Sequence, residues 1–298
     1  MLLDMMFSTE PIIEVQNLIG ADLEWLGHGM ALFGDSRLVL VLAVMMFWFM
    51  SRHRPYQVLA ASLVGAALGS GLKLFFDVGR PAGPDLLLST TTTSPAFPSG
   101  HVMLATCFWG ALAWYGFIPK WLSAAIIGMV MFARVYLGAH FIGDVVFGAL
   151  IGFAWLVVFH RWIGPLLERA NPRTVSTVVA LAMAGSFAIL PITSAFPFGW
   201  EIVGGLVGAG VGLILQERKV GFDPVAVAGH WQLAKAGIGV FGILLVIGID
   251  FVLPFEIMIV ELAMYFMAAI WGLLLAPILF QRLGLGTDKA DREPVPAS

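Results

Sequence analysis

The chain has 298 residues, of which 59% are hydrophobic and only 12% are Asp, Glu, Lys or Arg. A water-soluble domain usually carries about twice that charged fraction, so the composition excludes an ordinary soluble enzyme and assigns most of the chain to a lipid bilayer. The net charge of −3 and the lack of a basic patch give no support for a nucleic-acid partner. The one cysteine, Cys107, cannot form a disulfide within the chain.

The amino-terminal region, before the first long apolar stretch, is too polar to span a membrane. Apolar residues recur at helical spacing over 11–34, but Glu14, Asp22 and Glu24 interrupt them. This pattern predicts an amphipathic helix that lies on the membrane surface. Residues 1–35 are therefore expected to form an amino-terminal interfacial segment.

Nine apolar stretches follow, each long enough to cross the hydrocarbon core if tilt is allowed, since a crossing takes about 20 helical residues. They are 36–51, 57–76, 100–118, 121–138, 143–160, 174–194, 199–215, 232–252 and 257–280. Each must be helical, because backbone groups have to be paired inside lipid. The predicted fold class is all-α, a polytopic membrane helix bundle with about nine transmembrane helices. The weakest stretch is 199–215, because its six glycines suit close helix packing better than independent stability.

Positive charges in the loops predict how the bundle is oriented. With the amino terminus outside, twelve of the sixteen Lys and Arg residues fall on the cytoplasmic side, as the positive-inside tendency favours. The four left outside are Arg37, Lys73, Arg80 and Arg134. We therefore expect a multi-pass protein of the cell membrane with its amino terminus outside. Its carboxyl terminus, a disordered tail over 284–298, is expected in the cytoplasm.

Three polar fragments lie where apolar stretches begin or end. They are Lys73-x6-Arg80-Pro81, Pro98-Ser99-Gly100-His101 and Arg134-x5-His140-x3-Asp144. Uncompensated charge in lipid costs roughly several kcal/mol per group, so polar residues kept there usually have a function. The predicted orientation brings all three fragments to the non-cytoplasmic face, although the loop charges and the fragments are mostly different residues.

The first fragment supplies two cations. Lys73 and Arg80 are two helical turns apart, so a helix that continues through Gly79 would place both on one face. Arginine presents a planar fork of donors to phosphate oxygens, and lysine adds a compact charge. Snorkelling toward headgroups is the simpler interpretation of either residue alone, and the other fragments weaken it. The hydroxyl-rich run 89–95 in the next loop predicts a flexible connection or a lip beside the site.

The second fragment is expected to begin a helix. Ser99 would stand at the helix start, where free N–H groups favour an anion. Its hydroxyl can donate to a phosphate oxygen, although a plain helix cap is the simpler interpretation of this residue alone. Gly100 lets the backbone approach a ligand closely, and His101 is placed to protonate a leaving oxygen.

The third fragment has the residue types that a histidine nucleophile needs. His140 and Asp144 have i, i+4 spacing, so the carboxylate can accept the Nδ1 proton and leave Nε2 free to attack phosphorus. Such an attack gives a phosphohistidine intermediate, which water then hydrolyses. Arg134 would neutralise the charge that spreads over the equatorial oxygens. Simple solvation is the alternative for any one histidine near an interface.

Together these fragments resemble the three signatures of the type-2 phosphatidic acid phosphatase superfamily. The family pattern is Lys-x6-Arg-Pro, Pro-Ser-Gly-His and Ser-Arg-x5-His-x3-Asp. The first two match in full, and the third departs in having Ala133 in place of the serine before Arg134. That serine is an auxiliary group, so its loss is expected to weaken phosphate contacts without changing the assignment. The resemblance covers residues from about 36 to 162.

The resemblance implies a role for each matched residue. His140 would be the nucleophile, Asp144 its orienting carboxylate and His101 the general acid. The residues that would bind phosphate are Lys73, Arg80, Ser99, Gly100 and Arg134. The resemblance also implies a reaction without a metal or other cofactor, and inhibition by vanadate as a phosphate mimic.

The resemblance also implies a domain organisation and a function. The family's six-helix core would occupy 36–195, and additional transmembrane helices would occupy 196–283. The expected protein is an integral membrane phosphatase that hydrolyses a phosphomonoester or diphosphate of a lipid at the non-cytoplasmic face. Its partners would be the lipid phosphate substrate and the surrounding membrane lipids.

Other functions stay open on the sequence alone. The same site could act on a soluble sugar phosphate, or transfer the phosphoryl group from a lipid to an alcohol. A phospholipid transporter is a remote alternative, because the charges gather at one face and no ladder of ionisable residues crosses the helices. His140 and Asp144 also have ligand-like spacing, but the cations around them would repel a metal ion. The sequence decides neither the identity of the lipid nor whether copies assemble into a homo-oligomer.

Overall fold

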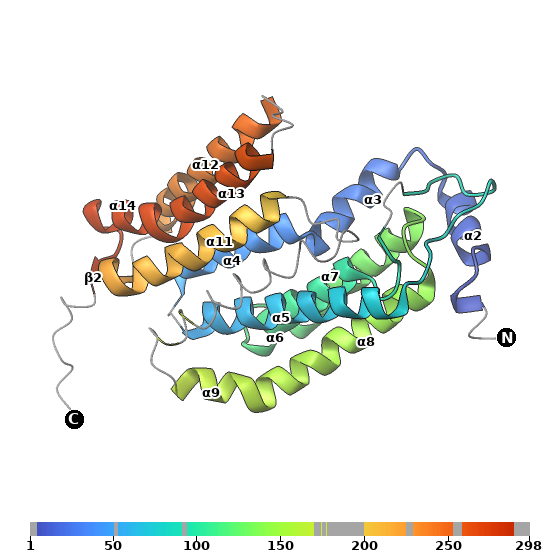
Figure 1. Cartoon of the computed structure of the whole chain (residues 1–298), viewed down its shortest axis with the longest axis horizontal. Coiled ribbons are helices and arrows are strands. Elements are labelled where there is room, and N and C mark those ends of the chain that lie inside the picture. The colour runs from blue at the N-terminus through green and yellow to red at the C-terminus, as the bar shows by residue number, and fades with distance from the viewer. Residues whose placement is uncertain are drawn as a thin grey trace. The chain divides into compact units, whose positions relative to one another are not determined.

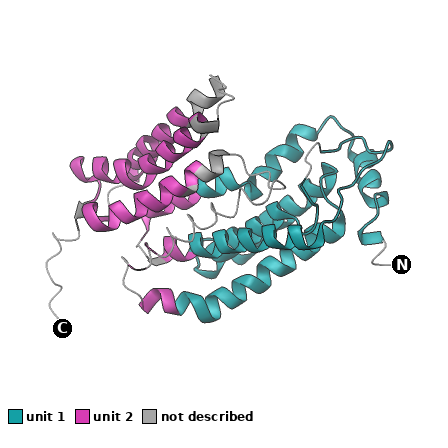
Figure 2. Ribbon diagram, viewed as in Figure 1, with its two compact units in different colours: residues 1–40, 58–165, 194–197 teal, residues 41–57, 166–193, 198–298 magenta. Residues whose placement is uncertain are grey.

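A computed structural model of the protein describes residues 5–50, 53–90, 94–169, 174, 177, 200–224, 229–252 and 258–288. The chain divides into two compact units, coloured separately in Figure 2. Unit 1 consists of 1–40, 58–165 and 194–197, and unit 2 consists of 41–57, 166–193 and 198–298. Every residue predicted to form the phosphate site belongs to unit 1. The four-part division proposed from the sequence remains a prediction.

The described residues contain four helical stretches that are long and apolar enough to cross a membrane. They are Arg54–Phe76, Ile142–Arg169, Gly229–Val246 and Leu262–Arg282. A fifth is reached if Glu24–Gly34 and Ser36–Phe49, which are bent by 46° at their junction, count as one span. The expectation of an all-helical membrane protein is confirmed at this level.

Other predicted stretches are helical but short. These helices are α4 (Ser36–Phe49), α6 (Gly100–Trp114), α7 (Lys120–Tyr136) and α11 (Trp200–Leu215), with 14 to 17 residues each. They fall below the roughly 20 residues that a full crossing takes, so the total of nine crossings stays a prediction. Apart from residues 174 and 177, the predicted stretch 174–194 lies outside the described residues.

Unit 1 is built around α6, whose side chains are buried over most of its length. It packs against α7 and against α8 (Ile142–Val158), as Figure 1 shows. The helix α5 (His53–Phe76) reaches the same core, because Gly65 and Gly69 leave room for side chains of α6. The chain continues from α8 through a π-helical turn (Phe159–Ile163) into α9 (Gly164–Arg169).

The amino-terminal segment contains two helices where the sequence predicts one over 11–34. The helix α2 (Glu10–Ile19) ends at Gly20, whose φ of +82° lies in the left-handed region that favours glycine. The helix α3 (Glu24–Ala31) and a 3₁₀ turn, η1 (Leu32–Gly34), follow it. Both α2 and α3 contact α7, so this segment is packed onto the helix bundle. Its position at the membrane surface stays a prediction.

Gln16 of α2 attaches this segment to the loop that carries Arg80. Its buried amide Nε2 donates hydrogen bonds to the carbonyl oxygens of Leu88 (2.9 Å) and Tyr136 (2.8 Å). Its Oε1 accepts from the backbone N–H groups of Leu87 (2.8 Å) and Leu88 (3.2 Å). One side chain therefore pairs four backbone groups and fixes the loop against the end of α7.

Unit 2 depends on a close contact between α11 and α13 (Met258–Ile270). A Cβ atom at Gly204 would lie 2.0 Å from the Leu262 carbonyl oxygen, and one at Gly208 would lie 2.4 Å from the Phe266 carbonyl oxygen. Only glycine allows the two backbones to approach so closely, which accounts for the glycine-rich composition of this stretch.

The rest of unit 2 continues both helices toward the carboxyl terminus. A π-helical turn (Trp271–Leu275) joins α13 to α14 (Ala276–Arg282), and α12 (Gly229–Val252) packs beside them. The strands β1 (Phe222–Asp223) and β2 (Thr287–Asp288) pair antiparallel.

The start of the predicted disordered tail is therefore ordered in the structure. The backbone N–H of Leu285 donates to the Phe280 carbonyl oxygen (2.7 Å), and the Leu285 side chain is buried. Burial of this side chain and the pairing of β2 hold residues 284–288 in place. Residues 289–298 lie outside the described part of the chain.

Replacing Gln16 with leucine should destabilise unit 1. The change leaves four backbone groups without their hydrogen-bond partner. Each buried polar group without a hydrogen bond lowers the free energy of unfolding by about 1–3 kcal/mol. We expect a melting temperature several degrees lower in detergent and faster proteolysis within residues 77–98. The matched control is Asn17→Leu, which changes an exposed amide on the same helix. Equal melting of the two variants would contradict the anchoring role of Gln16.

Candidate active site

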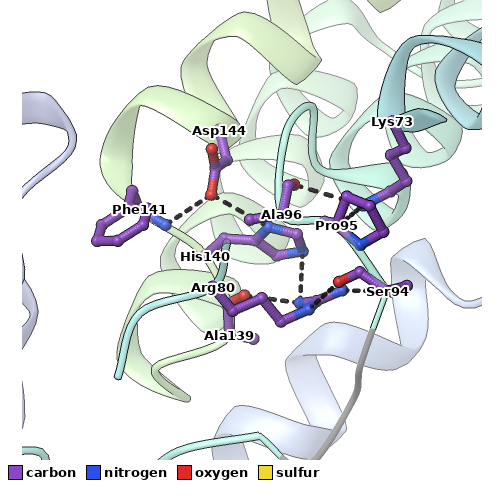
Figure 3. Close-up of polar contacts among 9 residues, drawn as sticks. All are labelled: Lys73, Arg80, Ser94, Pro95, Ala96, Ala139, His140, Phe141 and Asp144. Atoms are coloured by element: carbon purple, nitrogen blue, oxygen red, sulfur yellow. Dashed lines mark hydrogen bonds and ion pairs between the residues drawn. The ribbon is translucent and has the colours of Figure 1, made fainter. Parts of the chain in front are cut away.

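Arg80 comes from the loop after α5 and is held in one orientation (Figure 3). Its Nε donates to the Ser94 carbonyl oxygen (2.7 Å), and Nη2 donates to Ser94 Oγ (2.9 Å). Its Nη1 donates to the Ala139 carbonyl oxygen (2.7 Å) and lies 3.4 Å from Nε2 of His140. The guanidinium is thus fixed beside the ring nitrogen that the sequence assigns to nucleophilic attack.

Lys73 belongs to the last turn of α5, and the same short stretch of loop holds it. Its Nζ donates to the carbonyl oxygens of Pro95 and Ala96, next to Ser94 (Figure 3). Residues 94–96 therefore bind both cations of the first fragment through backbone oxygens.

The helix-face explanation for Lys73 and Arg80 is wrong. The helix α5 ends at Phe76 and does not continue through Gly79. Asp77 follows it with a φ of +45°, a left-handed conformation that Asp tolerates better than most residues and that stops the helix. The loop carbonyls, and not a shared helical face, gather the two charges.

The side chains of His140 and Asp144 lie close together, although His140 precedes α8 and does not share a helical turn with Asp144 as the spacing predicted. His140 Nδ1 lies 3.4 Å from Asp144 Oδ2, and both side chains are buried (Figure 3). The same Oδ2 accepts a hydrogen bond from the Phe141 N–H (2.9 Å), which fixes the carboxylate at the start of α8. Helix capping therefore fixes Asp144 near the imidazole, although among the described residues His140 Nδ1 has no hydrogen-bond partner.

A glycine between Arg134 and His140 makes the turn that positions His140. Gly138 has a φ of +62°, and a Cβ there would lie 2.2 Å from the Leu88 carbonyl oxygen. The N–H groups of Ala139 (3.1 Å) and His140 (3.2 Å) both donate to the Arg134 carbonyl oxygen and close the turn. Gly138 stands among the unspecified positions of the third fragment, so the spacing of that fragment gives no signal for it.

Ser99 precedes the first residue of α6, and its backbone is tied to α8. Its N–H donates to the Asp144 carbonyl oxygen (3.0 Å), so the second and third fragments meet directly. Its side chain makes no capping hydrogen bond, and within the described part of the chain its buried Oγ has no hydrogen-bond partner. A Cβ at Gly100 would approach Lys73 Cε to 3.6 Å. Among the described residues, the Ser99 hydroxyl therefore does not act as a helix cap.

His101 and Arg134 line one pocket of about 460 Å³ in unit 1. Arg134 Nε is buried and has no hydrogen-bond partner among the described residues. Both groups act electrostatically on His140. The second and third fragments therefore supply His101 and Arg134 to a shared pocket.

Burial and the surrounding charges control the protonation of His140. Burial lowers its pKa well below the ordinary value, and nearby positive charges lower it further. These charges belong to Arg134, Arg80 and Lys73, with a smaller contribution from His101. Burial likewise lowers the pKa of Arg80, which Asp144 opposes. The imidazole is thus neutral and keeps the lone pair that an attack on phosphorus requires.

The charges that surround His140 suit an anion. Among the described residues, no group of three or more His, Cys, Asp and Glu side chains is placed to hold a metal ion. Unpaired buried donors at Ser99 and Arg134 stand beside two further cations and the free N–H groups of a helix start. An anion such as phosphate is the kind of ligand that these donors suit.

Family models match both halves of this chain. A model described as the PAP2 superfamily matches residues 56–167, which contain all eight predicted site residues. A second, described as the PAP2 superfamily phosphatase transmembrane extension, matches residues 200–290. The chain belongs to the PAP2 superfamily. This confirms the resemblance drawn from the three fragments and places the protein among membrane phosphatases.

A curated PAP2 relative is the undecaprenyl-diphosphatase of Sulfolobus acidocaldarius. It is 28% identical over 124 residues, which are 39% of this chain and 58% of that protein. The match therefore spans less than two thirds of that relative's length. No solved structure matches the chain.

The departure from the PAP2 pattern at Ala133 has a packing explanation. Ala133 is fully buried in an apolar cluster with Ala31, Leu88, Tyr136 and Leu137. A serine hydroxyl at this position would lie among apolar side chains, where an unpaired polar group is costly. The methyl group instead helps α3 and the loop pack against α7.

Adding one methyl group at Gly138 should remove activity. Gly138→Ala would combine left-handed strain of roughly 1–2 kcal/mol with a clash against the Leu88 carbonyl, which displaces His140. We expect phosphatase activity to fall about 100-fold or more, as misplaced catalytic groups do. The matched control is Gly116→Ala, because Gly116 has a φ of +76° and nothing within 4 Å of its Cβ position. Equal activity in the two variants would show that the turn at Gly138 is not needed.

The pH dependence should report the neutral imidazole of His140. Since its pKa is lowered, the nucleophile stays unprotonated as the pH falls below 6.5. We expect the acidic limb of the kcat/KM profile to lie below pH 6.5. The profile should be measured with a monoester and with a diphosphate, so that ionisation of the substrate can be separated from ionisation of His140. Arg134→Gln removes a positive charge and should move the limb to higher pH, while Arg134→Lys should leave it in place. A limb above pH 6.5 in the wild type would contradict this electrostatic account.

Proposed function

We propose that this PAP2 protein hydrolyses a phosphomonoester or diphosphate of a lipid at the non-cytoplasmic membrane face, through a phosphohistidine on His140. The observation that carries the proposal is the placement of His140 between two oriented groups. Asp144 lies against Nδ1, and the Arg80 guanidinium lies 3.4 Å from Nε2. A phosphate held by Arg80 would be presented to that nitrogen.

In the first step, His140 Nε2 forms a bond to phosphorus as the bond to the leaving oxygen breaks. The positive charge that develops on the imidazole is stabilised by Asp144, whose orientation the Phe141 N–H maintains. His101 gives its proton to the leaving oxygen, so that the lipid product departs as a neutral alcohol or as a phosphate monoester.

In the second step, water replaces the enzyme on phosphorus. His101, now neutral, accepts a proton from the water as its oxygen attacks, and the bond to His140 Nε2 breaks. Inorganic phosphate leaves, and both histidines return to their starting protonation states. The two half-reactions balance without any group that the chain does not supply.

Stabilisation of the transferred phosphoryl group would come from cations and a hydroxyl that the three fragments supply. Lys73, Arg80 and Arg134 supply charge, and Ser99 Oγ supplies a hydroxyl that is unpaired among the described residues. Backbone N–H groups near Gly100 add the partial positive charge of a helix start. Because the protein fixes these donors in advance, they need little reorganisation as charge spreads over the oxygens.

Several observations support a lipid substrate. The chain is an integral membrane protein, and exposed aromatic side chains at Phe75 (80%) and Phe76 (49%) end the helix that carries Lys73. The relative named undecaprenyl-diphosphatase supports a lipid diphosphate among the candidates. The distribution of Lys and Arg between loops supports the non-cytoplasmic face.

The test is phosphate release from a panel of lipid monophosphates and diphosphates by wild type and His140→Ala. We expect His140→Ala to lose about 10³-fold or more in rate, as removal of a nucleophile does. The exposed His230→Ala is the control and should retain full activity. Rapid quenching of the wild type should trap an acid-labile phosphoryl group that the His140→Ala variant lacks.

Four results would count against the proposal. An active His140→Ala enzyme would refute the nucleophile. Turnover of sugar phosphates but not of lipid phosphates would refute the substrate class, and phosphate transfer to added alcohols in preference to water would refute hydrolysis. Intact cells should process a lipid phosphate confined to the outer leaflet, and failure to do so would refute the assigned face.

A further inference from the structure

We propose that Asp35 is a positioning residue for His101, and that the amino-terminal segment forms the leaving-group side of the active site. This inference rests on the proposed function, because it concerns the step in which His101 protonates the leaving oxygen. Asp35 lies outside both regions that the family models match, which are 56–167 and 200–290.

The contact itself is between one carboxylate oxygen and one ring nitrogen. Asp35 Oδ2 lies 4.0 Å from His101 Nε2, and the two side chains are 28% and 35% exposed. The other oxygen, Oδ1, accepts a hydrogen bond from the Arg37 N–H (2.8 Å) at the start of α4. The carboxylate is thus fixed by its helix while one oxygen faces the imidazole.

His101 needs such a partner because most of the charges that face it are positive. Those that act on it are Arg134, Arg80 and Lys73, and His101 in turn acts on His140. Each cation opposes protonation of His101, yet a general acid must carry a proton before it can donate one. Asp35 is the carboxylate that lines the same pocket, and it also offsets the charge of Arg134. A further titratable group there, His28, is paired with Glu24 (3.4 Å).

Close packing of the amino-terminal segment on α6 sets the position of Asp35. A Cβ at Gly34 would lie 2.6 Å from the His101 carbonyl oxygen, so only glycine allows this approach. The neighbouring Phe33 carbonyl accepts a hydrogen bond from Trp109 Nε1 (2.7 Å). Asp35 therefore directly follows a backbone segment that packs against α6 at His101.

The pocket beside Asp35 suits a leaving group with a hydrophobic chain. Its lining joins His101 and Arg134 to Trp25 and Leu32 of the amino-terminal segment. The exposed fractions of these two apolar side chains are 69% and 54%. A lipid alcohol could lie along them while its oxygen remains within reach of His101.

Helix capping alone would also explain an aspartate at position 35. Asn and Asp cap helices about equally well, so Asp35→Asn keeps the cap and removes the charge. If capping is the whole role, the variant should behave as the wild type does. This substitution therefore separates the two explanations without loss of the fold.

The experiment compares two substrates with the full-length enzyme in detergent. One is a long-chain alkyl phosphate, whose leaving oxygen needs a proton, and the other is a 4-nitrophenyl phosphate that carries an alkyl chain of equal length and leaves without one. We expect Asp35→Asn to lower kcat about 10- to 100-fold for the alkyl substrate and less than about 3-fold for the aryl substrate. The melting temperature should not change. Asp85→Asn, an exposed carboxylate in the loop of unit 1, is the control.

The outcomes distinguish this inference from the proposed function. Equal losses on the two substrates, or no loss on either, would overturn the role of Asp35 while a His140-dependent phosphatase remained. Activity that survives His140→Ala would overturn the proposed function first and the role of Asp35 with it. A selective loss on the alkyl substrate, at unchanged stability, would support both.

Discussion

The gathering of like charges around a buried imidazole is the constraint on which unit 1 depends. Lys73, Arg80 and Arg134 repel one another, and partial burial strengthens that repulsion relative to water. Backbone carbonyls of residues 94–96 and of Ala139 accept hydrogen bonds from two of the cations and thereby reduce the cost. The hydrogen bonds to these carbonyls account for how closely the loop is held around the two cations.

Residues of unit 1 that do not contact the three cations also help to hold the loop around them in place. Gln16 binds the far end of the loop, and Gly138 allows α7 to turn toward His140 under the same loop. The backbone hydrogen bond from Ser99 to Asp144 joins the starts of two helices. Residues that hold the backbone thus alternate, along the same short segments, with residues predicted to bind phosphate. Substituting a residue that holds the backbone is therefore expected to move a neighbour that is predicted to bind phosphate.

The sequence predicted the all-helical membrane fold and the family, because both leave local signals. Apolar stretches locate spanning helices, and the three fragments identify the polar residues that membrane helices retain. The end of α5 at Phe76, the break at Gly20 and the role of Asp35 were not predicted. Each depends on a backbone conformation or a contact with a distant segment, which spacing along the chain does not encode. The sequence likewise does not show which backbone carbonyl oxygens accept hydrogen bonds from Lys73 and Arg80.

The stripe of Gly204, Gly208 and Gly212 in α11 has a consequence for how unit 2 can diverge. Consecutive members are four residues apart, so the stripe stays on one side of the helix. Inserting or deleting one residue within α11 would rotate everything beyond that point by about 100° and turn larger side chains toward α13. Point changes on the opposite side should accumulate freely among homologues, whereas the length of this helix should be invariant.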